Sequence, residues 1–336
     1  MDTASRSALA PLLFRPVYKD YLWGGSRIAG RFGRAGAPSP CAESWEVSCH
    51  PDGMSVVEGG PFDGRSLDSL CREFGAALVG SWCENPGRFP VIVKLIDATS
   101  RLSVQVHPSE ESAARFGGDP KTEAWYFIDA EPGAAVCAGL KKGVGPRVFS
   151  DAVKEKSVPS LLRTVPAEPG KAVFIPGGTV HAICEGCLVL EVQQNSNTTY
   201  RVYDWDRTGP DGRPRELHVQ RALEAISWHA PELPVCTPYR LPSAVPENVR
   251  ERVVRSDWFS IERWTLAKPE PFVHDGRSFK IFFALGGDLG IAWPGAEAPV
   301  RVPAGRSCLV PASSGECSVS AAAGAAAPVA ALCVGL

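Results

Sequence analysis

The sequence has no long run of charge of either sign and no cluster of basic residues. Its 35 Lys and Arg are nearly balanced by 37 Asp and Glu, giving a formal net charge of −2. Because nucleic-acid-binding surfaces normally carry a basic patch or stripe, we expect no nucleic-acid partner. A glycine-rich phosphate loop of the P-loop or dinucleotide type is also missing, as is an alternating series of strands and helices. These absences disfavour a nucleotide-binding α/β fold.

Signals for export or membrane insertion are weak. The apolar run at residues 8–14 is short and interrupted by Pro11, which does not suit a signal peptide. Residues 317–336 carry no charge, but they are mostly Ala and lack the large apolar residues of a membrane span. The 11 cysteines are scattered and odd in number, as expected of reduced thiols. We therefore expect a cytoplasmic protein without a membrane contact, and we interpret residues 317–336 as a terminal pair of strands.

Glycine and proline are abundant, with 33 Gly and 30 Pro in 336 residues. Without a G-X-Y period, this excess indicates many turns between short strands. The length is sufficient for about two domains. The sequence therefore predicts a mostly β protein with a few short helices inserted.

Individual elements follow from the apolar patterns and the capping residues. Strands are predicted at residues 89–97, 104–107, 124–129, 172–175, 180–183, 188–193, 258–266, 279–285, 300–302 and 307–310. Helices are predicted from Ser66 to Gly80, from Glu110 to Phe116 after a Ser109 cap, from Arg147 to Lys154, and from Arg215 to Trp228.

Two stretches of the chain share the pattern G-x5-P. One is Gly170 to Pro176 and the other is Gly305 to Pro311. A turn glycine, a buried strand and a terminating proline would suit a unit repeated in two similar β-barrels. Residues 231–246 contain five prolines and no periodicity, which is typical of a linker. We therefore predict an N-terminal domain at residues 1–234 and a smaller C-terminal domain at 235–336.

Metal-ligating residues occur at strand spacing in the first half. Residues i and i+2 of a strand share a face, so Gln105 points the same way as His107, and Lys121 the same way as Glu123. If these faces meet inside a barrel with His181, then Gln105, His107, Glu123 and His181 offer two imidazoles, a carboxylate and an amide oxygen. Such a set suits Zn²⁺ and other borderline divalent ions. The alternative is that the histidines are structural and Glu123 is a solvated edge residue.

Several motifs of the chain resemble a known family. The segment Gly170 to His181 resembles the second motif of the cupin barrels, whose final histidine binds a metal. The resemblance extends in order to the segments Glu43–Glu46, Gln105–Pro108, Lys121–Trp125, Phe174–His181 and Gln193–Asp204. Together these look like type I mannose-6-phosphate isomerase in its short bacterial form, a member of the cupin superfamily.

The resemblance implies two cupin-like (jelly-roll) barrels and a zinc-dependent aldose–ketose isomerase. It implies one Zn²⁺ per chain, bound by Gln105, His107, Glu123 and His181. The second G-x5-P segment lacks a histidine, so a metal is expected only in the first barrel. The arginine of the Thr-Tyr-Arg motif, assigned as catalytic in the family, is Arg201. The family often has Asp four residues before it, whereas this sequence has Asn197.

Interconverting mannose 6-phosphate and fructose 6-phosphate requires a proton to move between adjacent carbons through a cis-enediol(ate). A cation and a fixed guanidinium stabilise the charge that develops on oxygen, a role that suits Arg201. The general base is expected at Glu191 or Lys121, which share the inward strand parity. Lys94, Ser103, Asn197 and Trp23 are candidates for substrate binding, although Lys94 also suits a surface position on an edge strand.

Two other functions fit parts of the pattern. Two histidines and a carboxylate also form the metal site of Fe(II)-dependent cupin oxygenases, but such a site has no need of Gln105. A non-catalytic sugar-phosphate-binding cupin would suit Asn197, but not the retained Arg201. The expected partner is a small sugar phosphate, and the expected assembly is a monomer or a weak homodimer.

Overall fold

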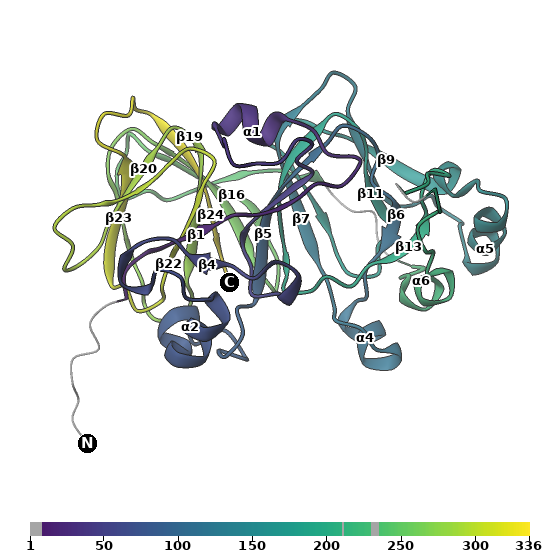
Figure 1. The fold of residues 1–336 in the computed structure, drawn as a ribbon, viewed down its shortest axis with the longest axis horizontal. Helices are drawn as coiled ribbons and strands as arrows, with labels where there is room; N and C mark the ends of the chain where they lie inside the picture. Colours follow the sequence, from purple (N-terminus) through teal and green to yellow (C-terminus); the bar gives the residue numbers. More distant parts are fainter. Residues whose placement is uncertain (1–8, 210–211, 230–234) are drawn as a thin grey trace. The chain divides into compact units, whose positions relative to one another are not determined.

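The computed structural model describes residues 9–209, 212–229 and 235–336 (Figure 1). Strands dominate these residues and helices are few and short, so the predicted mostly β class is confirmed. Among the described residues, no helix has the length and apolar character needed to cross a membrane. Residues 1–8 and 231–234, part of the weak apolar start and of the predicted linker, lie outside the described residues.

The strands form four sheets, each with two edge strands, so none closes into a barrel among the described residues. The first sheet has the order β15 (Tyr239–Leu241), β16 (Val249–Arg255), β17 (Ser260–Leu266), β24 (Val329–Gly335), β19 (Lys280–Gly286), β22 (Ser307–Val310), β1 (Leu12–Arg15), β4 (Val56–Val57). The second has the order β18 (Glu270–Val273), β23 (Glu316–Ala321), β20 (Leu289–Ala292), β21 (Val300–Val302). The third has the order β14 (Val235–Cys236), β10 (Ala172–Ile175), β7 (Glu123–Ala130), β12 (Cys187–Gln194), β5 (Val91–Ala98), β3 (Glu43–Val47), β2 (Val17–Lys19). The fourth has the order β13 (Tyr200–Tyr203), β6 (Val104–Val106), β11 (His181–Ile183), β8 (Ala135–Leu140), β9 (Leu162–Pro166).

The helices begin where the sequence supplies caps. The α-helices are α1 (Arg27–Phe32), α2 (Leu67–Phe74), α3 (Ala76–Val79), α4 (Glu110–Phe116), α5 (Pro146–Lys154) and α6 (Val219–Ala225), and the 3₁₀ turns are η1 (Pro51–Gly53), η2 (Gly60–Phe62) and η3 (Val158–Leu161). Ser109 caps α4 by accepting from the Ser112 amide at 3.1 Å, as predicted. The helix predicted from Ser66 to Gly80 is divided into α2 and α3, because Gly75 adopts φ +47° between them. The last predicted helix is shorter than expected and begins only after His218.

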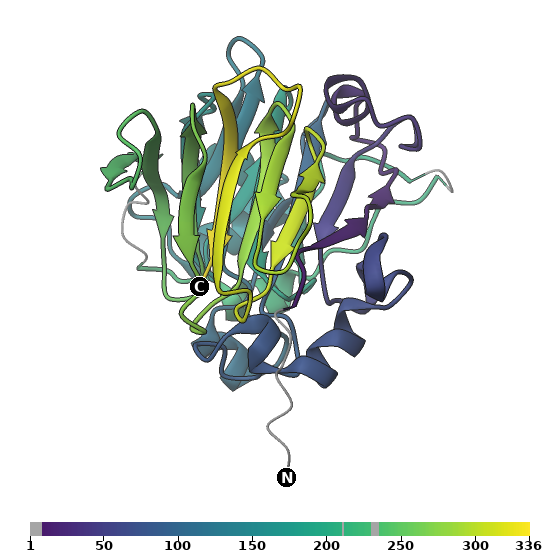
Figure 2. The same ribbon diagram turned by 90° about the vertical axis from the view of Figure 1, so that its left-hand side faces the viewer.

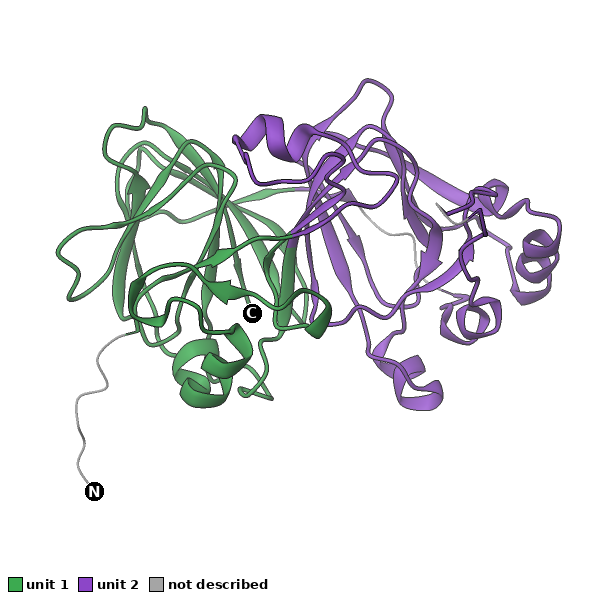
Figure 3. Cartoon of the chain, viewed as in Figure 1, with its two compact units in different colours: residues 1–17, 45–93, 238–336 green, residues 18–44, 94–237 purple. Residues whose placement is uncertain are grey.

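The chain forms two compact units, shown in green and purple in Figure 3. Unit 1 comprises Met1–Val17, Trp45–Val93 and Pro238–Leu336, and unit 2 comprises Tyr18–Ser44 and Lys94–Thr237. The expected division after residue 234 falls near the end of unit 2, but two amino-terminal segments group with the C-terminal residues. Strand pairing accounts for this, since β1 pairs with β22, Leu12 opposite Leu309, and also with β4. Such long-range pairing leaves no trace in the local sequence pattern.

In unit 1, two sheets pack face to face over an apolar core. Trp264 and Phe282 come from the eight-stranded sheet, and Phe272 and Ile291 from the four-stranded one. Figure 2 shows the strands of the larger sheet, green to yellow, side by side. Residues 317–336 supply two strands as expected, but β23 and β24 lie in different sheets and do not pair with each other.

Unit 2 repeats this construction. Its core contains Trp125 and Val189 from the seven-stranded sheet and Ala138 and Ile183 from the five-stranded one. The two G-x5-P segments are matched in structure: β10 and β22 each follow a left-handed glycine, Gly170 at φ +86° and Gly305 at φ +77°. Each unit thus has one such strand, in accordance with the repeat seen in the sequence.

Candidate active site

A buried group of polar side chains lies between the two sheets of unit 2. His181 on β11 and Gln105 on β6 stand opposite each other in one sheet, and Gln105 is also opposite Arg201 on β13. Glu123 on β7 and Glu191 on β12 come from the other sheet. Strand alternation directs these residues to the same interior, as the parity of the sequence predicted.

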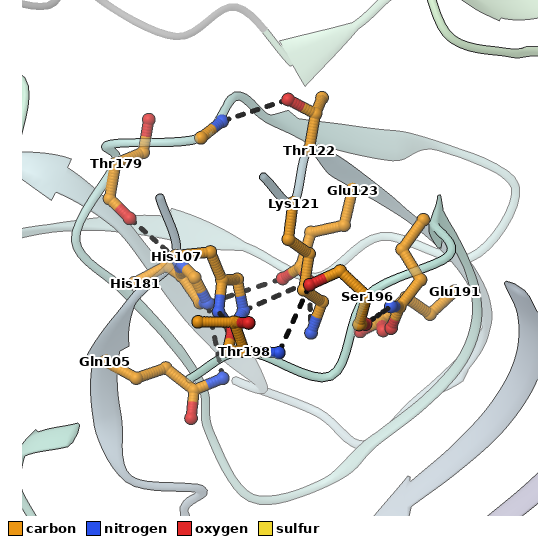
Figure 4. A network of polar contacts seen from close by, with 12 residues as sticks. Gln105, His107, Lys121, Thr122, Glu123, Thr179, His181, Glu191, Ser196 and Thr198 are labelled. Atoms are coloured by element: carbon orange, nitrogen blue, oxygen red, sulfur yellow. Dashed lines mark hydrogen bonds and ion pairs between the residues drawn. The ribbon is translucent and has the colours of Figure 1, made fainter. Parts of the chain in front are cut away.

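His107, Glu123 and His181 form a compact cluster (Figure 4). One ligand atom from each lies within 4.8 Å of the others, and all three side chains are buried. His107 Nε2 is 3.3 Å from Glu123 Oε2, and His181 Nε2 is 3.3 Å from Glu123 Oε1. The alternative of a solvated Glu123 is therefore wrong, because its side chain is only 1% exposed.

Backbone carbonyls fix the orientation of both imidazoles. His107 Nδ1 is 2.7 Å from the Thr198 carbonyl, and His181 Nδ1 is 2.8 Å from the Thr179 carbonyl. A carbonyl only accepts, so each Nδ1 carries the proton and each Nε2 presents its lone pair toward Glu123. Gly178 supports this arrangement: its amide donates to the His107 carbonyl at 2.7 Å, and its φ of +86° suits glycine.

The electrostatics favour neutral imidazoles beside an ionised carboxylate. Burial, with the Lys121 ammonium nearby, lowers the pKa of His107 to about 3, and burial likewise lowers the pKa of His181. Burial alone would raise the pKa of Glu123, but Lys121 and the two histidines hold it well below its usual range. Lys121 Nζ lies 3.1 Å from Glu123 Oε2.

A second buried group surrounds Glu191. Its Oε1 is 3.0 Å from Lys94 Nζ, and its Oε2 accepts from the Trp125 indole at 2.9 Å. Burial and the Glu123 charge raise the pKa of Glu191, against the effect of Lys94. Burial alone would lower the pKa of Lys94, but the charges of Glu191, Glu43 and Glu123 raise it instead. The surface position considered for Lys94 is wrong, since it is buried next to these carboxylates.

Both groups face one cavity of about 400 Å³. Apart from His107, every residue predicted for the site lines it: Trp23, Lys94, Ser103, Gln105, Lys121, Glu123, His181, Glu191, Asn197 and Arg201. Ser103 reaches the cavity beside Gln105, to whose Oε1 its hydroxyl donates at 3.1 Å. Asn197 is exposed, whereas Trp23 is buried.

Arg201 is half-buried at this cavity and is held in place. Its Nη1 donates to the Glu216 carbonyl at 2.9 Å, and its amide donates to His218 Nδ1 at 3.3 Å. Burial and the neighbouring Arg215 lower the pKa of the guanidinium.

Some cavity residues were missed by sequence reasoning. Trp125 shares strand parity with Glu123, which could have indicated it. Glu43 lies in one of the motifs that carry the family resemblance but was given no role, and Arg215 carries no local signal. His218, which contacts Arg201, has no partner pattern in the sequence.

Comparison with known proteins identifies the family. Residues 12–133 match the family model for the catalytic domain of type I phosphomannose isomerase. The probable mannose-6-phosphate isomerase GmuF of Bacillus subtilis is 37% identical over 269 residues, 76% of this chain and 80% of that protein. The chain belongs to the type I mannose-6-phosphate isomerase family. This confirms the predicted family and, with it, an enzyme of the isomerase class.

Solved structures agree with this assignment. The crystal structure of mannose 6-phosphate isomerase from Bacillus subtilis superimposes with a TM-score of 0.86 at 29% identity, covering 98% of this chain and all of that one. A mannose 6-phosphate isomerase bound with zinc and yttrium shares the fold, with a TM-score of 0.73 at 16% identity over 97% of this chain and 99% of that one.

Proposed function

We propose that this protein interconverts mannose 6-phosphate and fructose 6-phosphate with a divalent metal, through a cis-enediol(ate). The observation that carries the proposal is the buried His107–Glu123–His181 cluster facing the same cavity as Arg201 and Glu191. Family membership supplies the substrate, because relatives such as GmuF carry the name mannose-6-phosphate isomerase.

The cluster fits a metal ion. His107 Nε2 is buried and has no hydrogen-bond partner in the part of the chain that the structure describes. Glu123 Oε2 likewise accepts no hydrogen bond there, although it forms an ion pair with Lys121. Two neutral imidazoles and a carboxylate form a donor set that suits Zn²⁺. Gln105 would complete the set, although its Nε2, rather than its oxygen, faces His181 Nε2 at 3.3 Å. Rotating the amide by 180° would present the oxygen, and the two orientations occupy the same space.

We assign one zinc ion per chain to Gln105, His107, Glu123 and His181, in line with the relative whose structure holds zinc. When bound, zinc supplies a Lewis acid that stabilises negative charge on a sugar oxygen. Arg201 serves the same purpose from the protein, since its guanidinium is held at the cavity by the Glu216 carbonyl.

Glu191 is the preferred general base. Its raised pKa brings a carboxylate closer to the neutral range where proton transfer is efficient. Lys94 and Trp125 hold the two carboxylate oxygens, so its position is defined. Lys121 is the second candidate, but its contact with Glu123 means that replacing it would also disturb the metal ligands.

The remaining predicted residues have positions that suit substrate binding. Asn197 is exposed at the cavity and can meet a sugar hydroxyl, and Trp23 provides an apolar wall. Ser103 acts on the substrate through Gln105, which it contacts. Lys94 is bound to Glu191 and therefore supports the base.

We also propose that the two sheet pairs are two cupin-like jelly rolls, the second without a metal. The matched G-x5-P strands β10 and β22 support this relation. Among the described residues, His107, Glu123 and His181 form the one cluster of metal-ligating side chains, and it lies in unit 2.

A coupled assay of mannose 6-phosphate conversion tests the function. We expect activity to disappear in chelator, to return with zinc, and to fall on the order of 10²–10³-fold in Arg201→Ala. Arg147→Ala is the matched control, because Arg147 is exposed on α5 away from the cavity. Unchanged turnover after complete metal removal would contradict the mechanism. Tightly bound iron with oxygen-dependent turnover would instead identify an oxygenase.

A further inference from the structure

Unit 1 contains a polar cavity of its own. It has a volume of about 510 Å³ and lies at one end of the apolar core between the two sheets. Lys280 at the start of β19 and Glu262 on β17 come from the eight-stranded sheet, and His274 follows β18 of the four-stranded sheet. Cys333 lines the cavity and also belongs to the apolar core, which includes Phe272. The cavity thus corresponds in construction to the one that holds the candidate active site of unit 2.

Cations are in excess around this cavity. Four basic side chains line it, two of which are paired: Arg252 lies 2.7 Å from Glu262, and Arg277 lies 3.1 Å from Asp275. Arg255 and Lys280 form no ion pair or side-chain hydrogen bond within residues 9–209, 212–229 and 235–336. Arg255 and Lys280 are therefore the two lining cations without a paired side chain in the described part of the chain.

The strand register places these two cations at the same end of the sheet. Arg255 stands opposite Ser260, and Ser260 opposite Gly335. Because Ile281 is opposite Val334, Lys280 falls opposite Gly335 on the same row. A single small ligand in the cavity is therefore near both positive charges.

His274 adds a hydrogen-bond acceptor. It is 8% exposed, and its Nδ1 lies 3.1 Å from the Ser278 carbonyl, so Nδ1 carries the proton. Its Nε2 is buried and has no partner among the described residues. A buried acceptor without a donor is unfavourable, and a ligand hydroxyl would satisfy it.

We propose that the unit 1 cavity is a second binding site, which binds a phosphate group. A phosphate group accepts charge-assisted hydrogen bonds from the two unpaired cations, Arg255 and Lys280. A hydroxyl of the same molecule donates to His274 Nε2. Among the described residues, no group of three metal-ligating side chains lies in this cavity, so it differs from the unit 2 site in this respect.

Equilibrium dialysis with radiolabelled inorganic phosphate tests the site on the full chain. We expect wild-type protein to bind phosphate in unit 1, and the double variant Arg255→Ala/Lys280→Ala to bind it at least about 100-fold more weakly there, about tenfold for each cation. The double variant Arg240→Ala/Lys268→Ala removes the same charges from exposed positions outside the cavity and should bind like wild type. Thermal unfolding confirms that all variants are folded.

Arg201→Ala separates this site from the catalytic cavity. Binding that persists in Arg201→Ala and is lost in Arg255→Ala/Lys280→Ala supports the proposal, whether or not the chain isomerises sugars. Phosphate binding identical in wild type and Arg255→Ala/Lys280→Ala would overturn it.

Mannose 6-phosphate then distinguishes the two sources of the phosphate group. If the ligand is a sugar phosphate, it binds more tightly than inorganic phosphate, and His274→Phe removes the difference. If the ligand is free phosphate, both probes bind equally and His274→Phe has no effect. Either result supports a phosphate site, and binding of neither probe in unit 1 would contradict it.

Discussion

The two units are built from the same arrangement of sheets, but they differ in the polar residues that surround their buried carboxylates. Each packs two sheets face to face, and each has a buried tryptophan whose indole donates to a buried carboxylate: Trp125 to Glu191 at 2.9 Å and Trp264 to Glu262 at 2.7 Å. In unit 2 Glu191 meets Lys94, and the nearby Glu123 meets two imidazoles. In unit 1 Glu262 meets Arg250 and Arg252.

The two carboxylates differ in whether ligand atoms remain open to a cation. Glu262 is neutralised by two guanidinium groups, which lower its pKa and leave no open donor set. Glu123 faces two neutral imidazoles and one ammonium, so ligand atoms remain available to a cation. The fold therefore provides a polar cavity in each unit, and the few residues that contact its buried carboxylates determine what the cavity can bind.

The largest contrast is expected from removing one charge at a buried carboxylate in each unit. Glu123→Gln should lower the isomerase activity by at least on the order of 10³-fold, because it removes an anionic metal ligand. Glu270→Gln, at a buried carboxylate bonded to Ser243 and Asn248 outside both cavities, should cost about 1–3 kcal/mol of stability but retain kcat. Isomerase assays and denaturant unfolding of both variants measure the two effects. A fully active Glu123→Gln would contradict the expected difference between the units.

His274 should give unit 1 a pH-dependent stability. Burial lowers its pKa to about 4, with Lys280 acting in the same direction and Ser278 and Asp275 opposing. Between about pH 6.5 and pH 4 the unfolded chain takes up a proton that the folded chain does not, so stability is complete above this window and falls as the pH falls. The loss is up to about 3 kcal/mol. Denaturant unfolding from pH 8 to 4 should show a shallower decline in His274→Gln; identical slopes would contradict this.

The smallest contrast concerns the two tryptophans. Trp125→Phe should lower kcat about tenfold and shift the acidic limb of the pH–rate profile, because Glu191 loses a hydrogen bond that positions it. Trp264→Phe should cost about 1–3 kcal/mol of stability and leave the pH–rate profile unchanged. Equal effects of both substitutions on the profile would show that Trp125 has only a structural role.

Much of the site could be predicted because it depends on local spacing. The residues of each pair, Gln105–His107 and Lys121–Glu123, lie two positions apart, so the alternation of an extended chain predicts them on one face. One member of each pair, Gln105 on β6 and Glu123 on β7, lies within a strand. Local capping likewise predicted α4 from Ser109, and the run at residues 172–175 matches β10.

The remainder depends on contacts between distant segments. The Thr198 and Thr179 carbonyls that orient the histidines are backbone atoms, which carry no sequence signal. The pairing of β1 with β22 joins residues almost 300 positions apart, so the composition of unit 1 was not foreseeable. Lys94 is buried beside the carboxylates of Glu43 and Glu191, which lie on other strands and are distant in sequence.

The central claim is that unit 2 alone holds a catalytic cation, and metal analysis tests it most directly. Mass spectrometry of purified protein should find one zinc per chain in the wild type and none in Glu123→Gln, with activity following the metal content. A full equivalent of zinc retained in Glu123→Gln, or full activity in metal-free wild type, would contradict the account.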